Sequence, residues 1–284
     1  MNTNSQKTIV ITGCSSGFGR LTALRLAQQG WQVFGTVRKD EDKEKLVSEL
    51  ENVHKELLTP IVCDITQAED VAFLAQTVAA TTSHLDALLN NAGTAFAAPL
   101  ELLSLEDLTA QFEVNVIAQV RVTQALLPLL KSAKGTIINV SSVSGKISTP
   151  MTGAYSASKF AMEAISDTLR LELAPFGVRV VIIEPSSSPT NVWQTSMKRS
   201  LERLEPHRVG EYAKLLTTFE KLANVLSKRG FPPQRFVDTV ERILANSKPR
   251  ARYVVPRSAS LEVALRRFLP DAVFDGIVRR SLRW

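Results

Sequence analysis

The amino-acid sequence predicts an α/β protein with a single doubly wound parallel sheet. Six short apolar runs alternate with longer amphipathic segments between Thr8 and Thr190, which is the pattern of parallel strands joined by crossover helices. The runs are rich in Val, Ile and Leu, as expected of strands that are buried on both faces. We therefore expect one domain over residues 1–284.

The composition excludes several classes of protein. Hydrophobic residues make up 44% of the chain and charged residues 22%, which argues against disorder, and no apolar run is long enough to cross a bilayer. The polar start and the two cysteines, Cys14 and Cys63, indicate neither secretion nor a disulfide framework, so we expect a cytoplasmic protein. The net charge of +6 comes disproportionately from arginines near the C-terminus. These basic residues form no nucleic-acid-binding motif.

A glycine-rich turn follows the first expected strand, Thr8–Ile11, and precedes a helical pattern that stops at Gly30. Glycines let the backbone approach a pyrophosphate, and the start of a helix supplies free N–H groups. Strand, turn and helix therefore predict a dinucleotide site of the Rossmann type, with a mere tight turn as the alternative. The expected cofactor contacts in this turn are Gly13, Ser15, Ser16, Gly17, Phe18 and Gly19.

The second expected strand, Trp31–Val37, suggests which cofactor is bound. In dinucleotide folds an acid near this strand end binds the ribose of NAD, whereas Arg accommodates the 2′-phosphate of NADP. Thr36 stands about where the acid would be, and Arg38 follows two residues later. We expect a preference for NADP with NAD as the alternative. Alternatively, Arg38 and Lys39 are an ordinary solvent-exposed pair at the strand end that binds no ligand.

The third and fourth strands, Leu57–Val62 and Leu85–Leu89, also end in candidate ligand residues. After the third strand, Asp64 either accepts a hydrogen bond from adenine or caps the helix that begins near Ala68, and Ile65 is a further cofactor contact. The fourth strand leads into Asn90-Asn91-Ala92-Gly93, where small residues suit a backbone that passes close to a ligand. If the first and fourth strands are neighbours, both ends border the switch point at which such sheets bind ligands. The expected contacts after the fourth strand are Asn91, Ala92 and Gly93.

Ser104 has the signature of a helix cap, with an acid three residues later, and the helix is expected to run through Leu127. Asn115 lies in its middle, where Asn is a poor helix former. It is either an exposed polar residue or it bonds backbone and water inside the fold. The sequence alone favours the exposed position.

The remaining strands are Gly135–Val140 and Val178–Ile183, and each ends in a run of serines. Between them, Tyr155 and Lys159 begin an apolar helix and share one of its faces because they are four residues apart. A free Tyr titrates near pH 10, and an adjacent ammonium favours its phenolate. The pair is therefore a candidate proton donor and acceptor, although many helices carry an exposed Tyr and Lys.

Together these residues resemble the short-chain dehydrogenase/reductase family. The resemblance covers about Thr8 to Thr190 and is greatest to the branch of retinol, 17β-hydroxysteroid and carbonyl-reducing enzymes. The motifs stand in the family's order and spacing, and Ser142 precedes Tyr155 by the usual interval. They are Thr12-Gly-x-x-x-Gly17-x-Gly19, Asp64, Asn90-Asn91-Ala92-Gly93, Asn115, Ser142 and Tyr155-x-x-x-Lys159.

The resemblance implies hydride transfer between a nicotinamide and a carbonyl carbon. Tyr155 would be the acid or base, Lys159 would lower its pKa and hold the cofactor ribose, and Ser142 would bond the carbonyl oxygen. Asn115 would bind a water that links Lys159 to solvent. Pro185 and Thr190 would also contact the cofactor.

One residue departs from the family pattern. Ser186 stands where the family usually has Gly after Pro185, so we expect a narrower site or a shifted loop. No ligand-spaced His/Cys set is present, so no metal is expected.

The segment 191–230 would form a helical substrate lid, and its apolar residues suggest a hydrophobic substrate, with ordinary packing on the core equally well supported. Pro232-Pro233 introduces another helix, and Tyr253–Val255 is a candidate seventh strand. Residues 258–284 form an amphipathic helical extension rich in Arg. It is suited either to an anionic membrane surface or, as is more usual, to docking on protein.

The leading hypothesis is an NADP-preferring reductase or dehydrogenase for a small hydrophobic ketone, aldehyde or alcohol. A 3-oxoacyl-thioester reductase and a non-catalytic NAD(P) sensor are the alternatives. The resemblance implies a homodimer or homotetramer that pairs through the helices beginning near Ser104 and Tyr155.

Overall fold

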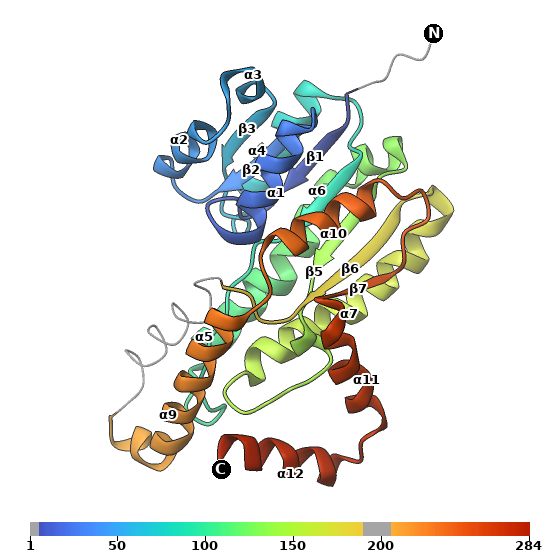
Figure 1. Ribbon diagram of the computed structural model, residues 1–284. Helices are drawn as coiled ribbons and strands as arrows, with labels where there is room; N and C mark the ends of the chain where they lie inside the picture. The colour runs from blue at the N-terminus through green and yellow to red at the C-terminus, as the bar shows by residue number, and fades with distance from the viewer. Residues whose placement is uncertain (1–5, 190–205) are drawn as a thin grey trace.

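The computed structural model describes residues 6–189 and 206–284. Its strands form one parallel seven-stranded sheet in the order β3-β2-β1-β4-β5-β6-β7, as Figure 1 shows. The predicted fold class is confirmed, including the seventh strand. The strands are β1 Thr8–Ile11, β2 Gln32–Val37, β3 Leu58–Val62, β4 Ala87–Asn90, β5 Thr136–Val140, β6 Arg179–Pro185 and β7 Arg252–Val255.

Helices cover both faces of the sheet. One face packs against α1 (Gly17–Gln28), α2 (Glu41–Ser48) and α10 (Gln234–Leu244). The other packs against α4 (Ala68–Thr81), α6 (Ala118–Ala133) and α7 (Gly153–Leu173). The shorter helical segments are α3 Asn52–Lys55, α5 Leu105–Phe112, η1 Glu113–Ile117, η2 Val143–Gly145, η3 Ala174–Phe176 and η4 Arg257–Ala259.

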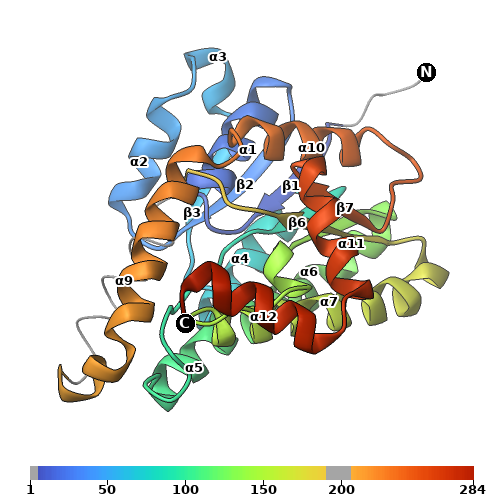
Figure 2. The same cartoon turned by 60° about the horizontal axis from the view of Figure 1, so that its bottom comes forward.

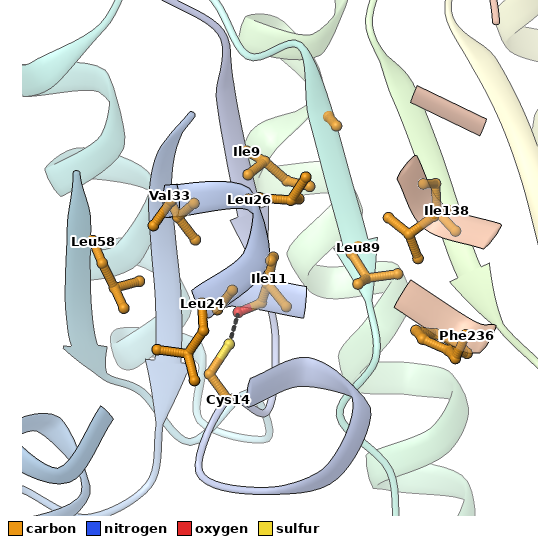
Figure 3. Packing of buried hydrophobic residues seen from close by; sticks show 14 of the residues in the cluster. Ile9, Ile11, Cys14, Leu24, Leu26, Val33, Leu58, Leu89, Ile138 and Phe236 are labelled. Atoms are coloured by element: carbon orange, nitrogen blue, oxygen red, sulfur yellow. Dashed lines mark hydrogen bonds between the residues drawn. The ribbon is translucent and has the colours of Figure 1, made fainter. Parts of the chain in front are cut away.

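The core beneath α1 and α10 is apolar, and aromatic side chains pack at one end of it. Figure 3 shows Ile9, Leu89 and Phe236 among the side chains that meet there, and all three are fully buried. Phe18 stacks on Phe236 at 4.2 Å between ring centroids. Burying a large apolar side chain contributes about 1.5–3 kcal/mol, so this packing anchors the start of α1 on the sheet.

The helix predicted after Ser104 differs from expectation in its middle. The cap is confirmed, because the Ser104 hydroxyl accepts a hydrogen bond of 3.0 Å from the Asp107 N–H. The helix is not continuous, however. Residues Glu113–Ile117 form a π-helical turn between α5 and α6, and Asn115 lies at its centre.

Three further helices lie at the end of the sheet where the strands terminate. They are α9 (Pro206–Arg229), α11 (Ser260–Phe268) and α12 (Asp271–Leu282), and Figures 1 and 2 show α12 crossing below the sheet towards α9. Leu215 and Phe219 of α9 pack with Ala97, Met151 and Leu282 in a small apolar cluster. Among the described helices, none is both long enough and apolar enough to span a bilayer.

The C-terminal extension is only partly docked. Leu282 is buried against α9, and Trp284 stacks on Tyr212 at 5.6 Å. Arg266 of α11 stacks on Phe274 of α12 at 4.5 Å and links the two helices. A second apolar set stays exposed and comprises Leu261, Leu265, Phe268, Val273 and Ile277.

Candidate active site

The glycine-rich turn after β1 has the shape that close ligand approach requires. Gly13 and Gly17 have positive φ values of 73° and 58°, which other residues rarely adopt. A Cβ on Gly13 would lie 2.9 Å from the Ala92 Cα, and one on Gly19 would overlap the Gly13 carbonyl. The Ser16 side chain does not cap α1, so it does not occupy the N–H groups of the first helical turn. The turn therefore fits a pyrophosphate.

The turn is braced from β4, its neighbour in the sheet. The Thr12 hydroxyl accepts hydrogen bonds of 2.9 Å from the N–H groups of Asn91 and Ala92. The Asn91 amide donates in return to the Thr12 and Gly13 carbonyls at 2.8 and 3.2 Å. The expected switch point is thus present, and the Asn91 side chain holds the turn itself.

Thr36 and Arg38 both lie near the end of β2, and the structure gives them different roles. Thr36 is buried, and its hydroxyl accepts a hydrogen bond of 3.0 Å from the Gly13 N–H. It therefore supports the turn from below. Arg38 is the first residue after β2 and is exposed, which leaves its guanidinium accessible to a ligand.

Asp64 does not cap α4, the alternative that its sequence position left open. Its Oδ1 accepts hydrogen bonds from the Thr66 N–H at 3.0 Å and from the Thr66 hydroxyl at 2.8 Å. The N-cap position belongs to Gln67. Ile65 is buried in the core beside Val71. Asp64 is therefore held in a tight turn at the carboxyl end of β3.

The structure brings Ser142, Tyr155 and Lys159 together from two segments. The Ser142 hydroxyl hydrogen-bonds to the Tyr155 phenol and donates to the Pro185 carbonyl at 3.3 Å. Lys159 Nζ lies 5.7 Å from the Tyr155 ring centroid and donates to the Val140 carbonyl at 2.8 Å. A phenol, a hydroxyl and an amine thus share one corner at the ends of β5 and β6.

Burial governs the protonation of this corner. Burial raises the pKa of Tyr155 above its usual value, and the hydrogen bond with Ser142 lowers it only in part. The lowering expected from Lys159 is therefore not achieved by the protein groups alone. Burial also lowers the pKa of Lys159 to about 8, against the raising effect of the Glu163 charge. Lys159 still carries its charge at neutral pH.

Asn115 is buried, which contradicts the exposed position that sequence favoured. Its Oδ1 accepts a hydrogen bond of 2.9 Å from the Thr94 N–H. Its Nδ2 donates to the Thr94 carbonyl at 3.0 Å and to the Ser158 hydroxyl at 3.1 Å. Both side-chain N–H groups are thus used by the protein, so on the side chain a water could bond only to Oδ1. π-helical turns occur often at functional sites, and this one turns Asn115 inward.

The loop after β6 keeps a regular backbone despite the change from glycine. The Ser186 N–H donates to the Val255 carbonyl at 2.7 Å and extends the pairing of β6 with β7. Among the described residues, positive φ outside glycine occurs at Lys134, Met151 and Arg283. Ser186 therefore needs no special conformation here. Thr190 and the lid residues 191–205 lie outside the described residues.

Sequence reasoning missed several supporting residues. Gln111 holds the segment after β4 by accepting from the Phe96 N–H at 2.9 Å and donating to the Thr94 carbonyl at 2.7 Å. Gln119 donates to the Ala92 carbonyl at 2.5 Å. Their four-residue spacing to Asn115 on one helical face was the available signal.

Comparisons with known proteins agree with this geometry. A family model described as short chain dehydrogenase matches residues 7–200. An NADPH-dependent 3-dehydrocapnine reductase from Ornithobacterium rhinotracheale is 34% identical over 281 residues, which cover 96% of each chain. Retinol dehydrogenase 5 from Mus musculus is 35% identical over 284 residues, or 95% of this chain and 87% of that one.

Solved structures extend the similarity to the whole fold. A short-chain dehydrogenase from Streptomyces avermitilis superposes with a TM-score of 0.80 at 28% identity, covering 97% of this chain and 96% of that one. The fold and the site thus define an NAD(P)-dependent oxidoreductase. The chain belongs to the short-chain dehydrogenase/reductase family.

Proposed function

We propose that this protein is an NADP(H)-preferring reductase or dehydrogenase that interconverts a hydrophobic carbonyl compound and its alcohol. The observation that carries the proposal is the meeting of Ser142, Tyr155 and Lys159 at the end of the sheet where the glycine turn lies. Gly93 follows β4, the strand that braces the glycine turn, and a Cβ there would lie 3.9 Å from Lys159 Nζ. The glycine turn and the three side chains therefore border the same region.

The three side chains divide the work of moving a proton. Tyr155 gives its phenolic proton to the substrate oxygen during reduction, or takes a proton from the alcohol during oxidation. Ser142 turns its single O–H from the Pro185 carbonyl to the same oxygen and stabilises the developing charge there. Lys159 holds a positive charge beside the phenol and favours the phenolate. When bound, the cofactor supplies the hydride chemistry at its nicotinamide and, once oxidised, a second positive charge.

The preference for NADP rests on Arg38. Its exposed guanidinium follows β2 directly, where an arginine can pair with a 2′-phosphate through charge-assisted hydrogen bonds. The related 3-dehydrocapnine reductase is NADPH-dependent, which supports the same choice.

A hydrophobic substrate is supported by the side chains beside the site. We propose that α9 is part of a substrate lid and that its cluster with Ala97 and Met151 forms a wall of the substrate site. Leu215 and Phe219 are buried in that cluster. Retinol dehydrogenases are among the relatives, and retinoids are substrates of this character.

The test is a matrix of cofactors and substrates. NADPH and NADH are each combined with a retinoid, a steroid ketone, a simple aryl ketone and a 3-oxoacyl thioester, and nicotinamide absorbance is followed. We expect the fastest oxidation with NADPH and a free hydrophobic carbonyl. Faster turnover of the thioester would favour a thioester reductase. Cofactor binding without any oxidation would favour a sensor and overturn the proposal.

We also propose that the enzyme forms a homodimer or homotetramer through α5 and α7. Leu105, Ile117 and Phe160 are large apolar side chains on or between these helices, and they are 79%, 48% and 45% exposed. Light scattering after gel filtration measures the mass directly, and a monomer at micromolar concentration would rule the assembly out.

The exposed face of α11 and α12 supports a peripheral membrane contact. Leu261, Leu265 and Phe268 share one face of α11 and are 65%, 50% and 79% exposed, and the last turns of α11 and α12 carry arginines. Such a surface suits anionic lipid. The full chain should co-sediment with vesicles of anionic lipid, and salt should weaken this binding. A form that lacks residues 258–284 should bind the vesicles less. Equal retention of both forms would refute this contact.

A further inference from the structure

Two buried glutamates from different elements lie behind the catalytic residues. Glu163 stands one turn after Lys159 on α7, and Glu184 immediately precedes Pro185 on β6. Their side chains are only 6% and 2% exposed. Burying carboxylates is costly unless they are paired and hydrogen-bonded, so this arrangement needs a physical reason.

Two cations reach both carboxyl groups. Lys146 Nζ lies 2.8 Å from Glu163 Oε2 and 3.9 Å from Glu184 Oε1. Arg252 Nε lies 3.0 and 3.5 Å from the same two oxygens. Arg252 also pairs with Asp167 at 2.6 Å, so its charge is divided among three acids. Asp167 has a further partner in Arg170 at 3.0 Å, whereas the two glutamates share the same two cations.

Two of the carboxyl oxygens lack a hydrogen-bond donor. Oε1 of Glu163 and Oε1 of Glu184 are buried and make no hydrogen bond within the described part of the chain, although the two cations lie 3.5 and 3.9 Å from Glu184 Oε1. The two carboxyl groups lie against the same two cations, and each could supply the other with the donor that is missing. Ionised carboxylates only accept hydrogen bonds, so a proton on one of the pair would provide the donor that the other lacks. Burial first, and then the charge of Glu163, raises the pKa of Glu184 to about 7, although Lys146 and Arg252 oppose the rise.

The pair touches each element that carries a catalytic group. A Cβ on Gly145, in the loop that begins at Ser142, would lie 3.2 Å from the Glu163 Cγ and from the Lys159 carbonyl. The loop is thus packed directly against α7. Lys146, the next residue, is ion-paired to Glu163, and Glu184 leads into the carbonyl that accepts the Ser142 hydroxyl.

We propose that Glu163 and Glu184 share one proton at neutral pH and act as a positioning pair that holds the Ser142 loop against α7 and keeps Lys159 charged. This inference rests on the proposed function. The groups that face the pair are Lys146 from the loop, Arg252 from β7, and Lys159 with Asp167 from α7. The charge of Glu163 raises the pKa of Lys159, which links the pair to the catalytic amine.

The first test needs no substrate and compares chemical denaturation of the wild type, Glu184→Gln and Glu241→Gln across pH. The pKa of Glu184 is raised from 4.5 to about 7 by folding. Its stabilisation is therefore complete below pH 4.5 and is lost as pH rises through 7. Gln is neutral at every pH, as the protonated Glu184 is, and it keeps a hydrogen-bond donor. The denaturation midpoint of Glu184→Gln should therefore rise relative to that of the wild type between about pH 5 and pH 8. Glu241→Gln, which removes a glutamate paired with Arg25 on another helix, should run parallel to wild type over this interval. A Glu184→Gln curve that also runs parallel would overturn the shared proton.

The second test records kcat against pH for Glu163→Gln, with the carbonyl substrate that the wild type turns over fastest. Removing the negative charge should move the alkaline limb to lower pH by roughly one unit, or about tenfold in kcat on that limb. Glu163→Asp should restore the limb towards wild type because it keeps the charge. A merely structural role would lower kcat equally at every pH, and that result would refute the link to Lys159. A wild type without activity would count against the proposed function, while the denaturation test would still decide the shared proton.

Discussion

The turn after β1 and helix α7 reach the same end of the sheet by different means. The turn is shaped by Gly13 and Gly19 and is tied to β4 by hydrogen bonds of Thr12 and Asn91. None of these four residues titrates near neutral pH. Helix α7 instead contributes Tyr155, Lys159 and Glu163, which are partly or fully buried and ionisable.

This contrast separates two kinds of sensitivity. Added atoms should damage the turn at every pH, because its function depends on the close approach of backbone to ligand. Changes of charge should damage the α7 side in a way that depends on pH. The predictions below test this division, beginning with the largest effect.

Tyr155→Phe removes the proton donor and should cut turnover by about 10²–10⁴-fold, the usual contribution of a positioned acid. Cofactor affinity, followed by fluorescence of bound NADPH, should change little because the turn is untouched. Tyr253→Phe is the matched control. Its hydroxyl accepts a hydrogen bond of 3.1 Å from the Arg250 N–H, far along the chain from the site motifs, and turnover should persist. Wild-type turnover in Tyr155→Phe would remove Tyr155 from the reaction.

Gly19→Ala tests the turn. The added Cβ would overlap the Gly13 carbonyl and the Asn91 amide, and overpacking costs about 1–3 kcal/mol. The Kd for NADPH, measured by titration, should rise roughly 10- to 100-fold by the same amount at all pH values. Gly276→Ala on α12 meets nothing within 4 Å and should leave the Kd unchanged. A strongly pH-dependent loss in Gly19→Ala would break the division between the two regions.

Lys159→Met tests the other side through stability. Folding lowers the pKa of Lys159 from 10.5 to about 8, so the charged amine destabilises the folded state below pH 8, and stability recovers as pH rises towards 10.5. Lys159→Met should therefore be inactive yet more stable than wild type by about 1–2 kcal/mol at pH 7, after allowance for the lost bond to Val140. Urea denaturation at pH 7 and pH 10 measures the difference, which should shrink at pH 10. An equal difference at both values would show that buried charge is not the cause.

Much of the nucleotide side could be predicted because its signals are local. Buried parallel strands appear as continuous apolar runs, and Gly13, Gly17 and Gly19 follow one such run directly. The ends of β1 and β4 could be placed together once the sheet was expected to reverse there. The structure then added Thr36, whose support of the turn depends on the register of β2 against β1.

The catalytic side was predictable in its residues and not in its environment. Asn115 is buried because the Thr94 backbone, 21 residues away, takes up its amide, and no local pattern announces that contact. Glu163 and Glu184 likewise meet only because β6 lies against α7. Burial also reversed the expected direction of the Tyr155 pKa, since desolvation depends on the whole surroundings of a group.

Arg38→Ala should have the smallest of these effects and is the one electrostatic contact proposed for the nucleotide side. Losing a charge-assisted hydrogen bond to the 2′-phosphate should raise the KM for NADPH about tenfold and leave the KM for NADH nearly unchanged. The NADPH effect should shrink in high salt, because exposed charges are screened. Lys39→Ala removes the neighbouring exposed charge, which pairs with Glu41 at 3.3 Å, and should change either KM less than twofold, as expected of a surface ion pair worth about 0–1 kcal/mol. Equal shifts for both cofactors in Arg38→Ala would mean that the arginine does not distinguish them, and the preference for NADP would then need another source.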